Sequence, residues 1–96
     1  MNSSINQKKV ILDYVVGKNI LDVGPGGGAL LSLLSETYKD KTFYGIDNSE
    51  QVVNSLKDKY NVIKGDAINI NNYFNNLDTI IFSSLIIIRP PIFKAP

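Results

Sequence analysis

A cluster of glycines and one acid near the start of the chain could bind a charged small molecule. The segment Ile20-Leu21-Asp22-Val23-Gly24-Pro25-Gly26-Gly27-Gly28 runs from an apolar stretch into a glycine-rich turn. Glycine permits a tight turn and has no Cβ to block a ligand that approaches the backbone. If a helix follows, its free N–H groups attract an anion, while the carboxylate before the turn attracts a cation. The candidate binding residues of this segment are Asp22, Gly24, Pro25, Gly26 and Gly28.

Further polar residues end later apolar stretches and could bind other parts of the same ligand. Asp47 comes nineteen residues after Gly28, and its carboxylate could accept strong hydrogen bonds from two ribose hydroxyls. Asn48 would then lie near a base, or it caps the next helix. Alone, Asp47 could also be an acid that flanks a helix, and Asp66 a turn residue. The other candidates are Asp66 and Ala67 of a Gly-Asp-Ala segment, and Ser83, which packing or capping explains as well.

The apolar stretches before these residues alternate with helical patterns. Strands are predicted at 19–23, 42–47, 61–64 and 79–82, and helices at 5–16, 29–38 and 48–60, with a short irregular helix at 68–77. The second helix should bury Leu30, Leu33 and Leu34. Strands separated in this way are joined by right-handed parallel crossovers, and mostly apolar strands suit a sheet covered on both faces. The fold class is therefore α/β: a doubly wound, mostly parallel, Rossmann-like sheet of about four strands in the order 3-2-1-4 with flanking helices.

The composition narrows the chemistry that the chain can perform. It contains no Cys and no His, which excludes thiolate catalysis and removes the commonest general base and metal ligand. We assign no metal site and no catalytic residue. The net charge is +1, and no basic run indicates nucleic-acid binding. The longest apolar stretch is about half a membrane span, and no signal core follows the N-terminus, so we expect a cytoplasmic protein that does not cross a membrane.

The glycine segment resembles motif I of the class I S-adenosylmethionine-dependent methyltransferases, in which an acid between apolar residues precedes G-x-G-x-G. Asp47 resembles the family's acid after strand 2, Gly65-Asp66-Ala67 its G-D-A/V segment, and Ser83 falls where its motif IV lies. The resemblance implies that Asp22 lies near the ammonium group of S-adenosylmethionine and that Asp47 binds the ribose. It also implies that Asp66 accepts a hydrogen bond from the adenine amino group.

Methyl transfer from S-adenosylmethionine to an unknown acceptor is the function that the resemblance implies. Two alternatives remain open. Gly24-x-Gly26-x-x-Ala29 also satisfies the dinucleotide-binding fingerprint, so the chain could be the nicotinamide-binding half of an oxidoreductase. It could also be a non-catalytic cofactor-binding partner module. The position of Asp22 favours S-adenosylmethionine, because dinucleotide-binding strands usually carry an apolar residue there.

The resemblance covers about residues 10–84 and only the N-terminal half of the family's fold. Residues 1–84 are therefore expected to form the S-adenosylmethionine-binding half of a methyltransferase domain. Residues 85–96 are expected to be an atypical apolar, proline-containing tail without a fifth strand, after a truncation or frameshift near Ser84; a natural short tail is the alternative. The isolated chain would then be inactive. The strand at 79–82 would expose an edge that could pair with a second copy or a partner chain.

Overall fold

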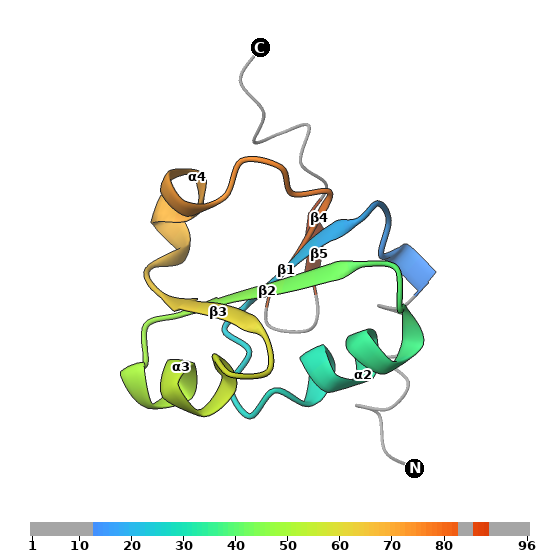
Figure 1. The fold of residues 1–96 in the computed structure, drawn as a ribbon. Coiled ribbons are helices and arrows are strands. Elements are labelled where there is room, and N and C mark those ends of the chain that lie inside the picture. The colour runs from blue at the N-terminus through green and yellow to red at the C-terminus, as the bar shows by residue number, and fades with distance from the viewer. Residues whose placement is uncertain (1–12, 83–85, 89–96) are drawn as a thin grey trace.

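The computed structural model describes residues 13–82 and 86–88 of the 96-residue chain. These residues form one five-stranded sheet between two layers of helices (Figure 1). Strands β1 (Asn19–Val23), β2 (Thr42–Asp47), β3 (Asn61–Lys64) and β4 (Thr79–Phe82) have the bounds expected from the sequence. They lie in the order β3-β2-β1-β4 and pair in parallel. The predicted strand order is confirmed.

The register of the parallel strands brings their carboxyl ends to one side of the sheet. Asp22 of β1 lies opposite Gly45 of β2 and Ile81 of β4. On the other side of β2, Asp47 lies opposite Lys64 of β3. The loops that follow β1, β2 and β3 therefore leave the sheet next to one another, and these are the loops that carry the candidate residues.

A fifth strand, β5 (Ile86–Ile88), follows β4 and pairs with it in antiparallel orientation, with Ile81 opposite Ile87. The expectation that no strand follows residue 84 is wrong, and so is the expectation that β4 exposes a free edge. Three residues separate Phe82 from Ile86, which is enough for a hairpin connection. Pairing satisfies the backbone N–H and C=O groups of β4, and it removes the reason to expect a dimer through that strand.

The helices divide between the two faces of the sheet (Figure 1). Helices α2 (Ala29–Thr37) and α3 (Glu50–Leu56) cover one face, while the 3₁₀ helix η1 (Ala67–Asn69) and the short helix α4 (Ile70–Tyr73) lie on the other. Most of the helix predicted at 5–16 lies outside the described residues; residues 13 and 14 are helical.

Helix α3 is capped by Ser49. The sequence had suggested Asn48 as the cap, and that prediction is wrong. The Ser49 hydroxyl accepts a hydrogen bond from the backbone N–H of Val52 at 3.2 Å. Both residue types are good N-caps, and the extended backbone of Ser49 places its side chain over the first turn. Asn48 is exposed and takes no part in the cap.

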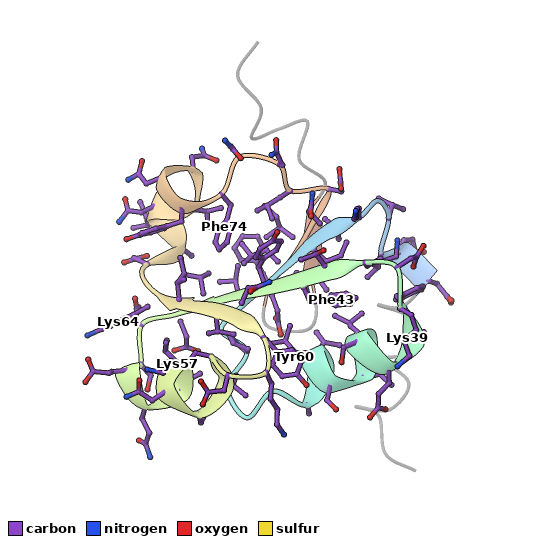
Figure 2. All side chains as sticks on the ribbon, in the orientation of Figure 1. Lys39, Phe43, Lys57, Tyr60, Lys64 and Phe74 are labelled. Carbon is purple, nitrogen blue, oxygen red and sulfur yellow. The ribbon has the colours of Figure 1, made fainter. Side chains whose placement is uncertain are left out.

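The two faces of the sheet bury separate apolar clusters because strand side chains alternate between the faces. Phe43 and Tyr60 lie on the α2–α3 side and Phe74 on the α4 side (Figure 2). Helix α2 buries Leu30, Leu31 and Leu34, whereas Leu33 is only partly buried and was wrongly placed in the core. The first cluster consists of Val15, Ile20, Leu30, Leu31, Leu34, Phe43, Val53, Leu56, Val62 and Ile81, and the second of Leu21, Ile46, Ile70, Leu77 and Ile80.

The turn before β1 depends on Gly17, and Gly17→Ala should destabilise the fold. Gly17 has φ of 78°, and a Cβ there would lie 2.2 Å from the Cβ of Asp78. Asp78 cannot easily move, because its Oδ2 accepts hydrogen bonds from the backbone N–H groups of Lys18 and Asn19 at 2.8 and 2.9 Å. We expect the free energy of unfolding to fall by about 1–3 kcal/mol in urea titrations. Gly27→Ala is the matched control, since its Cβ would meet nothing within 4 Å; equal losses in the two variants would contradict this account.

Candidate functional site

Backbone hydrogen bonds join the three loops at the carboxyl side of the sheet. The N–H of Gly24 donates to the carbonyl of Ile46 at 2.8 Å, and the N–H of Gly65 donates to the carbonyl of Asp47 at 3.0 Å. The first bond connects the glycine loop to the end of β2, and the second connects the end of β2 to the loop before Asp66. The glycine segment, Asp47 and Asp66 therefore belong to one continuous backbone frame.

The glycine loop leaves its first half open and closes its second half against α3. Gly24, Gly26 and Gly28 have φ of 72°, 55° and 87°, values that favour glycine. A Cβ on Gly24 or Gly26 would meet no atom within 4 Å, whereas a Cβ on Gly28 would lie 2.7 Å from Cδ2 of Leu56. A ligand can thus approach the backbone at Gly24 and Gly26, while Gly28 is needed for packing.

The N-terminus of α2 adds donors beside this open part of the loop. Its N-cap is Gly28, which has no side chain to bind the N–H groups of the first turn, and that turn contains no acid. The first N–H groups of a helix have no partner within the helix, and together with the helix dipole they attract anions. The loop and α2 therefore suit a ligand that presents a carboxylate.

Gly45 of β2 makes room for the glycine loop and was not among the residues predicted from the sequence. A Cβ at this position would lie 2.9 Å from Cγ2 of Val62 and 3.3 Å from Cγ of Pro25. Pro25 is buried, so the missing side chain of Gly45 lets the loop pack down on β2. A glycine inside a β-rich segment was the available signal, because such glycines mark a close approach of other atoms.

Asp22 is a buried acid without a partner. It is 1% exposed, and neither of its carboxyl oxygens has a hydrogen-bond partner. It shares a sheet face with Ile20, which lies in the apolar cluster under α2 and α3. Burial in these surroundings, with a smaller contribution from the negative charge of Asp47, raises the pKa of Asp22 from 3.8 to about 7. Such a group is expected to serve a ligand, because a native fold rarely leaves a buried polar group unsatisfied.

Asp47 and Asp66 each use one carboxyl oxygen to shape their own loop. Oδ1 of Asp47 accepts from the N–H of Ser49 at 2.9 Å, and Oδ1 of Asp66 accepts from the N–H of Ile68 at 3.0 Å. Asp47 is partly exposed and Asp66 is exposed, so both can contact a bound molecule. Ala67 begins η1 and packs against the apolar cluster on the α4 side.

The structure thus brings most of the candidate residues together at one side of the sheet. The glycine loop, Asp22, Asp47, Asn48, Asp66 and Ala67 all lie at the carboxyl side of β1–β3. Ser83 falls outside the described residues. Within the part of the chain that is described, no three potential ligands cluster as they would around a metal ion, and no helix has the length and apolar character to span a bilayer.

The chain belongs to the methyltransferase domain family, because residues 20–95 match the sequence model of that family. This match covers most of the chain. It also confirms the family resemblance seen in the glycine segment. No curated protein is significantly similar to the chain in sequence.

Solved structures of methyltransferases share the fold. The plantazolicin methyltransferase BpumL in complex with SAH is 24% identical, with a TM-score of 0.60 over 82% of this chain. BamL, in complex with a triazolic desmethylPZN analog and SAH, is 26% identical over 81% of the chain, with a TM-score of 0.62. A SAM dependent methyltransferase from Archaeoglobus fulgidus is 24% identical over 81%, also with a TM-score of 0.62. The chain spans 32%, 34% and 35% of these proteins, about a third of their length.

Proposed function

We propose that the chain binds S-adenosylmethionine at the carboxyl side of β1–β3 and serves methyl transfer to an acceptor. The observation that carries the proposal is Asp22, a buried carboxyl group without a partner next to a glycine loop that is open to a ligand. Membership of the methyltransferase domain family supports it. The complexes of BpumL and BamL with SAH (S-adenosylhomocysteine) support the choice of cofactor.

Each part of the cofactor has a group of matching chemistry in this proposal. Asp22 attracts the ammonium group, and the N-terminus of α2 receives the carboxylate of the same amino-acid end. The free oxygen of Asp47 accepts from the ribose hydroxyls, and Asn48 lies beside the base. Asp66 accepts from the adenine amino group, and the N–H of Ala67 donates to a ring nitrogen. Ser83 would contact the region between cofactor and acceptor.

The chemistry of the bound cofactor needs little from acid–base groups of the chain. S-adenosylmethionine would supply a methyl group on a sulfonium, and the neutral thioether that remains after transfer is a good leaving group. The residues described here bind and orient the cofactor, and orientation alone gives effective molarities of about 10⁵–10⁸ M in well-aligned reactions. In this proposal residues 1–84 form the cofactor-binding half of the domain, and the acceptor is unidentified.

Calorimetric titration at pH 8 with SAH and with NADH tests the proposed function. We expect saturable binding of SAH and none of NADH, because only SAH presents an ammonium group to Asp22. The variant Asp40→Ala should bind SAH as the wild type does. Asp40 is an exposed acid in the turn between α2 and β2, away from the carboxyl ends of the strands. Saturable binding of NADH without binding of SAH would instead establish the nicotinamide-binding alternative.

A further inference from the structure

We propose that Asp22 holds a proton in the free protein and releases it when S-adenosylmethionine binds, so that the ammonium group of the ligand decides selectivity. This inference rests on the proposed function and adds a mechanism of discrimination to it. Ligands with a cationic amino-acid end would bind more tightly as pH rises, whereas nucleosides without that end would not. Asp22 is thus inferred to be a specificity-determining residue.

The first support is the burial of Asp22 without any compensating contact. Its 1% exposure and two unpartnered oxygens mean that ionisation would place a negative charge among apolar side chains. Its strand neighbours in register are Gly45 and Ile81, neither of which offers a side-chain donor. A carboxyl group in such surroundings favours its neutral form.

The second support is the set of charges around Asp22. From β2, Asp47 contributes a negative charge that further opposes ionisation. The first turn of α2 contains no acid, and β4 (Thr79–Phe82) contains no charged residue. Lys64 lies at the carboxyl end of β3, and its Nζ lies 3.9 Å from Oε1 of Glu50 on α3, with both side chains exposed. The charge of Asp47 and the burial of Asp22 thus both oppose ionisation, and no described cationic side chain offsets them.

A bound ammonium group changes this balance. It would bring a positive charge and hydrogen-bond donors to the unpartnered oxygens, which favours the carboxylate. The proton of Asp22 leaves to the solvent, and the ligand keeps its own ammonium protons. Binding and deprotonation are then linked, so the affinity depends on the fraction of protein in which Asp22 is already ionised.

The size of the effect follows from the raised pKa of Asp22, about 7. By linkage, the affinity for SAH should rise about tenfold between pH 6 and pH 8 and become constant above that. Proton release per bound SAH should be close to one at about pH 6, about half at pH 7 and small at about pH 8. The nucleoside 5′-methylthioadenosine, which lacks the amino-acid end, should bind without either change.

Calorimetry of SAH binding to the full chain, in pairs of buffers with different ionisation enthalpies, measures proton release directly. We expect the wild type to show the release and the tenfold pH dependence, and Asp22→Asn to show neither, because its amide cannot titrate. Asp40→Asn is the matched control: this exposed acid lies in the turn between α2 and β2, outside the proposed site, and its variant should keep both the proton release and the pH dependence.

Different results would separate the two proposals. If SAH binds but the wild type releases no proton and its affinity is flat between pH 6 and 8, the proton-linked inference is wrong while the proposed function stands. If SAH does not bind at any pH, both fail. A carbon NMR titration of the Asp22 carboxyl group in the free protein gives a check without ligand. A midpoint near 7 supports the inference, and a midpoint near 4 overturns it.

Discussion

Asp47→Ala should weaken SAH binding at least tenfold while the protein remains folded. The variant loses the carboxylate that we assign to the two ribose hydroxyls, and a hydrogen bond to a charged group contributes about 1.5–3 kcal/mol. Because Asp47 is at the end of β2 and partly exposed, its removal leaves no cavity in either apolar cluster. Calorimetric titration at pH 8 measures the affinity, and circular dichroism checks the fold.

The loop contact of Asp47 requires a second variant. Its Oδ1 accepts from the N–H of Ser49, so Asp47→Ala also removes a bond that supports the start of α3. Asp47→Asn keeps an oxygen for this bond but lacks the charge and one acceptor. We expect its affinity to lie between those of wild type and Asp47→Ala. An affinity for SAH that is unchanged in both variants would show that Asp47 does not bind the ribose.

Asp22→Asn should make stability less sensitive to pH. The pKa of Asp22 is raised from 3.8 to about 7 in the folded state, so at a pH well below 4 its carboxyl group is neutral in both states and costs nothing. Between about pH 4 and 7 it ionises only in the unfolded chain, which increasingly favours unfolding. Above pH 7 both states are ionised and the cost is constant, on the order of 4 kcal/mol from the pKa difference of about three.

The free energy of unfolding of Asp22→Asn relative to wild type should therefore increase by about 4 kcal/mol from pH 4 to pH 8. Urea titrations across this range measure the difference. Asp58→Asn is the matched control, because this exposed carboxyl group on the surface is hydrated in both states. A difference between Asp22→Asn and wild type that does not change with pH would mean that Asp22 is ionised in the folded protein at little cost.

The strands of the parallel sheet were predictable because short apolar runs end at glycines, acids or serines. The runs 19–23, 42–47, 61–64 and 79–82 match β1–β4, and the doubly wound pattern of such folds then gives their order. The glycine spacing and the acids at or just after the carboxyl ends of β1, β2 and β3 indicated where a ligand would bind. That these loops are joined through Gly24 and Gly65 follows from the register, which local sequence does not specify.

What the sequence missed depends on contacts between distant segments. Residues 86–88 have an apolar pattern followed by prolines, and only the presence of β4 makes them a strand. The choice of Leu31 over Leu33 for the core depends on how α2 is rotated on the sheet. The protonation of Asp22 depends on its burial and on Asp47, and no spacing in the sequence encodes either.

The antiparallel β5 also determines which strand edges of the sheet are accessible to other chains. With the order β3-β2-β1-β4-β5, the outermost strands are β3 with four residues and β5 with three. Short outer strands offer few unpaired backbone N–H and C=O groups with which a strand of another molecule can pair. Natural proteins limit aggregation through sheet edges in this way. A three-residue outer strand therefore shields the longer β4 from self-association.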